Sequence, residues 1–340
     1  MPSGVIEALV DVYRRYSEET GIQGVALGPK EVAGTADATS RSGIAFVVAE
    51  KKPRQGARRR LADGSKLLPR RVDAAGRRYV TDVVESAPAA AAGAKPRMQR
   101  TRFTAGGPLS GRGGIGTFGC LVQRTGSRWV YALTNHHVGG SVGRRVFFPS
   151  SMAPGAVGAA TRFAVRSMAD EAFEPFVDQP DVMFHVDAAL PQVPHPQLPR
   201  FSPRIPTLGV PEAIFEPDES SAEAYAKSMV GTPVWAWSWN SKQRSGEISH
   251  VLYVTGSALP GVQLMYSFLV RGTGGVVPSL PRDSGKAWVT KGEGGRLELV
   301  GLHVGGASLS DEPCALAVAT DMHALARVLK IKPYVADQPS

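Results

Sequence analysis

The first 85 residues combine one helical pattern with several strand-like runs. Apolar residues recur at helical spacing from Val5 to Tyr16, with Ser3 before them as a cap and Gly21 after them as a stop. Strand-like runs follow at 23–27 (QGVAL), 43–50 (GIAFVVAE) and 79–84 (YVTDVV), joined by glycine-rich or basic connections. This pattern predicts a small α+β accessory domain over residues 1–85.

The pattern changes near residue 100. The alanine-rich, proline-bearing stretch SAPAAAAGAKPRM predicts a linker over 86–100. Many short apolar runs separated by Gly, Pro, Ser and Asp follow it, and they predict an antiparallel β-barrel protein over 101–332, with a tail at 333–340. Helical patterns at 218–229 and 319–330 interrupt and close this region.

Composition narrows the class of protein. No apolar run reaches the roughly 20 residues that a membrane span needs, and Glu7 and Asp11 stand where an export signal would need an apolar core. The two cysteines, Cys120 and Cys314, lack the spacing of a disulfide framework or a zinc site. We therefore expect a cytoplasmic protein that uses no metal and no organic cofactor.

The positive charge is concentrated in one part of the chain. The net charge is +9, and residues 51–100 hold 14 Lys or Arg against 4 Asp or Glu, a local excess of 10. The stretch KKPRQGARRR at 51–60 has no interleaved aromatic residues, which argues against nucleic-acid binding. A solvated loop is the first interpretation, and a docking surface for an acidic partner is the second.

Three short segments carry candidate chemistry. The stretch YALTNHHVGG places His136 and His137 after an apolar run, HVDAAL places Asp187 in a second run, and PRDSGKAWV places Ser284 before a third. A serine hydrolase needs a nucleophile, a base beside it and a carboxylate that orients the base. If the histidines end a strand, side-chain alternation lets only one of them face a given site.

The same segments resemble the conserved boxes of chymotrypsin-like serine proteases. TNHHV is similar to TAAHC or TNNHV, DAAL to DIAL, and RDSGKAWV to GDSGGPV. The resemblance selects His137, Asp187 and Ser284 as the triad, with Asp181 as a reserve carboxylate and His136 as a structural residue. It implies a serine endopeptidase acting on protein or peptide, built as two antiparallel six-stranded β-barrels with a closing helix.

Two further implications concern the region ahead of the barrels and the biological role. Residues 20–85 resemble the segment that precedes bacterial trypsin-like peptidases, in the pattern GVALG, EKKP, LPRRV and TDVVES. Bacterial cytoplasmic relatives of this kind act by a single activating cut in a partner protein. The resemblance thus implies limited proteolysis.

The chain departs from the family at the oxyanion hole. The backbone N–H groups of Arg282 and Ser284 are the implied donors, but the family has glycine where this chain has Arg282. A non-glycine residue at positive φ is strained by on the order of 1 kcal/mol. This strain is smaller than the ~3 kcal/mol by which one oxyanion donor stabilises the transition state. The alternative is a catalytically impaired, peptide-binding module whose hole is closed.

A fourth segment bears on specificity. VGLHVGGAS is similar to the GIHWGG segment of glutamyl endopeptidases, which implies a substrate pocket formed by His303, Ser279, Gly305 and Gly306. Imidazole and hydroxyl can bind a Glu or Gln side chain, and an imidazole pKa of about 6.5 would make the choice between them pH-dependent. The alternative is a buried strand histidine bonded to backbone.

Overall fold

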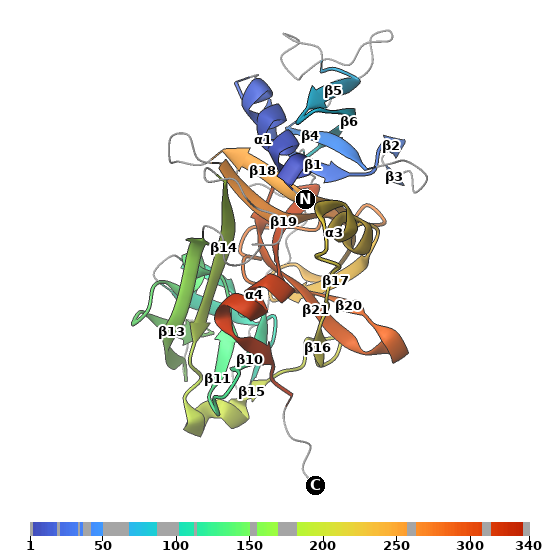
Figure 1. Ribbon diagram of the computed structural model, residues 1–340. Helices are drawn as coiled ribbons and strands as arrows, with labels where there is room; N and C mark the ends of the chain where they lie inside the picture. Colours follow the sequence, from blue (N-terminus) through green and yellow to red (C-terminus); the bar gives the residue numbers. More distant parts are fainter. Residues whose placement is uncertain are drawn as a thin grey trace.

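The chain is mostly β-sheet with few helices, as the sequence predicts (Figure 1). The computed structural model describes residues 3–18, 21–32, 35–36, 42–49, 68–86, 102–111, 114–149, 155–168, 182–256, 263–307 and 314–335. The basic stretch 51–60, most of the predicted linker and the reserve carboxylate Asp181 lie outside these ranges. Within them, no helix combines the length and the apolar character that crossing a membrane requires.

An amphipathic helix and a small sheet form the amino-terminal part. The apolar positions between Val5 and Val12 are buried, as the helical spacing predicts. Figure 1 shows this part at one end of the molecule, above β18 (Lys242–Gly256) and β19 (Gln263–Gly272). Its elements are α1 (Ser3–Tyr16), β1 (Ile22–Gly28), β2 (Glu31–Val32), β3 (Thr35–Ala36), β4 (Gly43–Val48), β5 (Arg71–Ala74) and β6 (Arg77–Glu85).

This sheet does not stop at the predicted domain boundary. Strand β1 pairs antiparallel with β18 (Lys242–Gly256), so that Val25 lies opposite Val254 and Leu27 opposite Val251. One core cluster accordingly holds buried side chains of α1 and β1 together with those of strands beyond residue 230. The division into domains at 86–100 stays a prediction, but the described residues on its two sides share a sheet and a core.

A second core lies among the strands that follow residue 102. Phe103, Phe118, Phe148 and Phe201 pack edge to face or tilted at its centre. The strands are β7 (Phe103–Thr104), β8 (Pro108–Gly111), β9 (Gly114–Thr117), β10 (Cys120–Arg124), β11 (Val130–Leu133), β12 (Arg145–Phe148), β13 (Val157–Met168), β14 (Val182–Pro191), β15 (Phe201–Ser202) and β16 (Ala213–Ile214). The helical elements here are α2 (His136–Gly139) and the 3-10 turn η1 (His195–Arg200).

The last third of the chain completes both cores. The helical patterns predicted at 218–229 and 319–330 are observed as α3 and α4. The elements are α3 (Ala222–Met229), β17 (Pro233–Ser238), β19 (Gln263–Gly272), β20 (Ala287–Lys291), η2 (Glu293–Gly295), β21 (Leu297–Gly306), β22 (Leu316–Asp321), α4 (Met322–Leu329) and β23 (Ile331–Pro333). Strand β23 returns to the earlier strands and pairs with β10.

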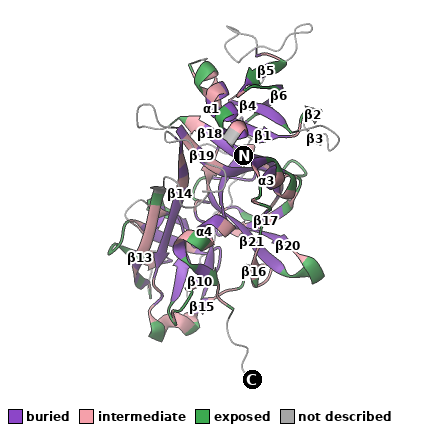
Figure 2. Ribbon diagram, in the orientation of Figure 1, coloured by how far each residue is buried: buried purple, intermediate pink, exposed green. Residues whose placement is uncertain are grey.

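Strand β20 lies between the two cores. Trp288 packs into the first cluster, whereas its neighbours Ala287 and Val289 pack into the second, as the alternation of strand side chains requires. Figure 2 shows β20 and the neighbouring β21 buried along most of their length, with exposed residues in the turn between them. The loop that carries Ser284 therefore leads directly into a strand fixed on both faces. The prediction of two six-stranded barrels goes beyond this description and stays a prediction.

Candidate active site

His137 lies on a short helical turn held against β14. Strand β11 ends at Leu133, and the backbones of Thr134 and Ala189 exchange two hydrogen bonds of 3.1 and 2.7 Å. Asn135 occupies the N-cap position of α2, and its Nδ2 donates to the carbonyl of Asp187 at 2.7 Å. The two histidines thus begin a helix, so strand alternation does not decide which of them faces a site.

Asp187 contacts His137 twice. Its Oδ2 is hydrogen-bonded to the ring Nδ1, and its Oδ1 accepts the backbone N–H of His137 at 3.0 Å. Burial alone would raise the pKa of Asp187, but the hydrogen bonds and charge of His137 lower it below its ordinary value. An ionised carboxylate only accepts, so Nδ1 of His137 carries a hydrogen, and in a neutral imidazole Nε2 is then the acceptor. The neighbouring His136 is bonded elsewhere, through Nε2 to Ser141 Oγ at 3.3 Å.

Ser284 lies in the loop before β20. Its carbonyl accepts the N–H of Thr117 at 2.8 Å, and its Oγ donates to the carbonyl of Val304 at 3.0 Å. No hydrogen bond joins Ser284 to His137 in the described structure. Gly285 has φ of 93°, and a Cβ there would lie 2.3 Å from the Thr117 oxygen, so only glycine fits.

The two implied oxyanion donors have a defined orientation. Arg282 has φ of 72°, the strained conformation expected where the family has glycine. The carbonyl of Pro281 accepts from Asn240 Nδ2 at 2.7 Å, and in a trans peptide the Arg282 N–H points the opposite way. Among the described residues, neither the Arg282 N–H nor the Ser284 N–H has a protein acceptor. The backbone therefore presents two unpaired donors beside the Ser284 side chain.

The structure brings His303 and Ser279 together but buries both. Ser279 Oγ and His303 Nε2 are 3.1 Å apart, and the His303 side chain has no solvent exposure. Burial and the charge of Lys286 hold the pKa of His303 well below its ordinary value, so this site favours the neutral imidazole. This differs from the pH-dependent imidazole expected from sequence, because that expectation assumed a solvated ring.

Gly305 and Gly306 end β21 beside Ser284. Pairing between β20 and β21 stops at Leu302, so the half-buried Val304 to Gly306 segment has no β20 partner on that side. A Cβ added to Gly305 would meet open space. This backbone is free to pair with an extended peptide.

The sequence reasoning missed two charged residues of the RDSGKAWV segment. Asp283 and Lys286 form an ion pair of 2.8 Å, and both side chains are wholly buried. The available signal was a pair of opposite charges three residues apart on either side of Ser284, followed by the apolar residues of β20. Lysine is so rarely buried that a solvent-facing position is the default interpretation.

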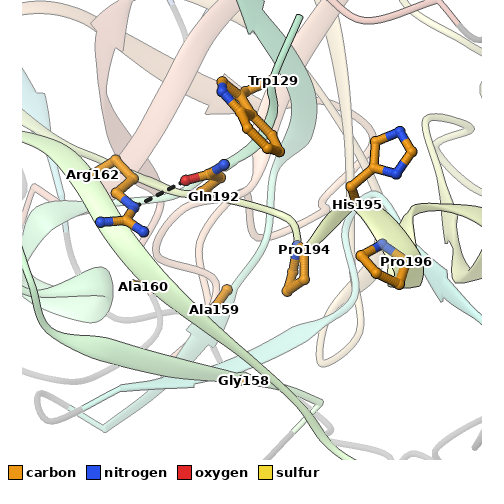
Figure 3. Close-up of a pocket in the computed structure, with 9 residues that line it drawn as sticks. All are labelled: Trp129, Gly158, Ala159, Ala160, Arg162, Gln192, Pro194, His195 and Pro196. Carbon is orange, nitrogen blue, oxygen red and sulfur yellow. Dashed lines mark hydrogen bonds between the residues drawn. The ribbon is translucent and has the colours of Figure 1, made fainter.

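A pocket of about 310 Å³ lies elsewhere, lined by residues of β13 and by residues at the start of η1 and just before it (Figure 3). Trp129 and His195 are among its lining residues, and Arg162, which also lines it, donates to Gln192 at 2.9 Å. None of the predicted site residues lines it. The described residues contain no cluster of three or more His, Cys, Asp or Glu that could hold a metal ion.

Comparison with known proteins gives matches among solved structures. No family model and no curated protein matches the chain. The Nocardiopsis protease NAPase is 15% identical, with TM-score 0.44 over 69% of this chain and 100% of its own. A glutamic acid specific serine protease described as using a histidine triad in substrate binding is 16% identical, with TM-score 0.41 over 68% and 100%. Cellulomonas bogoriensis chymotrypsin is 12% identical, with TM-score 0.41 over 68% and 99%. The solved structures to which the chain is similar thus include bacterial serine proteases of the chymotrypsin fold, the family that its sequence boxes resemble.

Proposed function

We propose that the chain is a serine endopeptidase in which Ser284 is the nucleophile, His137 the general base and Asp187 the orienting carboxylate. The observation that carries this proposal is the double hydrogen bonding of Asp187 to the ring and the backbone of His137. That arrangement fixes the ring and leaves Nε2 as the proton acceptor that a serine nucleophile needs.

The reaction begins with a change of the Ser284 rotamer. Its hydroxyl gives up the Val304 carbonyl and bonds His137 Nε2, a move between staggered wells of one torsion. Ser284 Oγ then attacks the scissile carbonyl while its proton passes to Nε2, and the N–H groups of Arg282 and Ser284 bind the oxyanion. His137 returns the proton to the leaving amine, and water hydrolyses the acyl-enzyme by the same steps.

The proposed substrate is a protein or peptide segment in extended conformation. It adds to the free edge at Gly305 and Gly306 by backbone hydrogen bonding. The Ser279 hydroxyl, oriented by His303, supports a preference for Glu or Gln before the cut, and a neutral imidazole favours Gln. The proposed substrate is a single partner protein that is cut at one place. Acidic residues of that partner would dock on the basic stretch 51–60 of this chain.

The proposed compartment is the cytoplasm. Cys120 and Cys314 are both buried and form no disulfide, and burial raises the pKa of the Cys120 thiol to about 12. Such thiols are inert structural residues that suit a reducing environment.

A second candidate is a non-catalytic module that holds a peptide at the same edge. The hydrogen bond from Ser284 Oγ to Val304, in place of one to His137, favours it. The two functions differ in the reactivity of Ser284, because only an enzyme activates the hydroxyl.

Labelling with a fluorophosphonate probe separates these functions. We expect labelling of the intact chain, none in Ser284→Ala, and a loss of hydrolysis of about 10⁴-fold or more in His137→Ala. His136→Ala is the matched control and should keep most of the activity. An unlabelled, folded wild-type chain would refute the enzymatic function, and dependence on His136 in place of His137 would refute the assignment of the base.

A further inference from the structure

A buried ion pair lies directly behind the nucleophile. Lys286 Nζ donates to Asp283 Oδ2 at 2.8 Å and to the carbonyl of Pro278 at 2.6 Å, and it lies 4.8 Å from the ring centroid of Trp288. The ammonium therefore has two oxygen acceptors and an aromatic face around it, and no exposure to water.

Asp283 is held from three directions. Besides Lys286, it accepts the Ser238 hydroxyl at 2.5 Å on Oδ1 and the Leu280 N–H at 3.1 Å on Oδ2. Burial alone would raise the pKa of Asp283, but the charge of Lys286 lowers it below its ordinary value, so the carboxylate is ionised. Ser238 comes from β17, which joins the loop to a neighbouring strand.

This carboxylate belongs to the residue between the two oxyanion donors. The Asp283 N–H bonds the Leu280 carbonyl at 3.1 Å, and the Lys286 N–H bonds the Asp283 carbonyl at 3.0 Å. Two consecutive turns thus wrap around the Asp283 side chain. The anchored side chain fixes the planes of the two peptides on either side of Asp283. The peptide between Asp283 and Ser284 contains the Ser284 N–H.

We propose that Lys286 is a positioning residue, whose ammonium holds the Asp283 carboxylate in the core and thereby fixes the N–H group of Ser284 for the oxyanion. The inference rests on the proposed function, since it assigns a role within the same site. Without Lys286, Asp283 would be an unpaired buried charge, and the loop would have to move to bring it to water.

The test compares Lys286→Met with Lys291→Met. Methionine keeps an unbranched chain of similar length without the charge, and Lys291 is an exposed lysine at the far end of β20. Both are assayed on a peptide that the wild type cleaves, well below each measured melting temperature. We expect kcat of Lys286→Met to fall about 10²- to 10³-fold, the effect of losing one oxyanion donor, with KM changed less than about threefold and Lys291→Met unchanged.

A second readout reports on the oxyanion directly. A peptidyl aldehyde forms a hemiacetal with Ser284 whose oxygen occupies the hole, whereas the corresponding peptidyl alcohol has no carbonyl carbon for Ser284 to attack and forms no such oxyanion. Lys286→Met should weaken inhibition by the aldehyde about as much as it lowers kcat and leave inhibition by the alcohol unchanged. A purely structural role would weaken both inhibitors together and overturn the proposal.

Should Lys286→Met fail to fold, the double variant Lys286→Met with Asp283→Asn removes both buried charges and is measured in the same way. Without the ion pair that anchors the loop, kcat should still fall more than threefold, but by a smaller factor than in the single variant, because no unpaired charge is left in the core. A kcat within threefold of wild type in whichever variant folds would overturn this inference and leave the triad standing. A wild-type chain that takes no fluorophosphonate would overturn the proposed function, and the inference with it.

Discussion

Replacing Leu9 by alanine tests whether the amino-terminal helix is part of the same cooperative unit as the strands that carry Ser284. Leu9 is fully buried on α1, in a core cluster that also contains Phe268 and Trp288. The helix packs on β1, and β1 extends the sheet through β18. The cavity left by Leu9→Ala would therefore open in a core shared by both parts of the chain.

The expected cost follows from that burial. Leu→Ala changes at fully buried positions lower the free energy of unfolding by about 3 to 5 kcal/mol. Unfolding entropy scales with chain length, and for a chain of 340 residues this corresponds to a melting temperature about 4 to 7 °C lower. The control is Val80→Ala, because Val80 is 44% exposed on β6 in the same part of the chain. It should cost less than about 1 kcal/mol.

Tryptophan fluorescence is the appropriate assay because all five tryptophans lie at residue 129 or later. Trp288 is buried in the core cluster that contains Leu9, so its emission reports on the strands beside Ser284. Leu9→Ala should shift the whole fluorescence transition and keep it single. A fluorescence transition that stays in place, while circular dichroism shows early melting of a separate unit, would refute the shared core and support an independent accessory domain.

Three further predictions concern strain and titration. Arg282→Gly should raise the free energy of unfolding, measured in urea, by up to about 1 kcal/mol and keep activity. The strain released at the positive φ of the folded state exceeds the entropy that glycine adds to the unfolded chain. A destabilised variant would contradict the strain. Because the pKa of His303 lies well below its ordinary value, the ratio of Glu to Gln cleavage should stay constant between pH 8 and pH 6 in a competition assay, and a rise toward pH 6 would show a solvated ring. Burial raises the pKa of Asp321 to about 7 in the folded state. Between about pH 4 and pH 7 the folded state therefore keeps a proton that the unfolded state has lost, and the free energy of unfolding falls as pH rises through this range. Asp321→Asn should therefore stabilise the chain more at pH 8 than at pH 5 in thermal unfolding, and an equal effect at both values would contradict the shift.

The sequence predicts the local elements well where their patterns are periodic. The helix expected from Val5 to Tyr16 is α1, and the runs at 23–27, 43–50 and 79–84 correspond to β1, β4 and β6. What the pattern does not contain is the partner of each strand. The pairing of β1 with β18 joins residues more than 200 positions apart, and no local signal distinguishes it from a separate small sheet.

The candidate site shows the same limit in its side chains. The boxes indicate His137 and Asp187, which lie in contact, but the geometry between them comes from a helical turn that the strand interpretation overlooked. Asn135 was the available signal, since asparagine is a preferred N-cap residue. Lys286 could not be placed from sequence, because its burial depends on a partner whose position the fold alone decides.

The pairing of β23 with β10 sets the order in which the molecule can mature during synthesis. Val122 lies opposite Pro333 and Arg124 opposite Ile331, so the sheet of β10 and β11 is incomplete until the segment Ile331–Pro333 has left the ribosome. Strand β11 leads directly to α2 and His137. A nascent chain would carry Ser284 and His137 long before the sheet that supports α2 was complete. The two candidate site residues can therefore reach their final arrangement only after the segment that follows α4 has been synthesised as well.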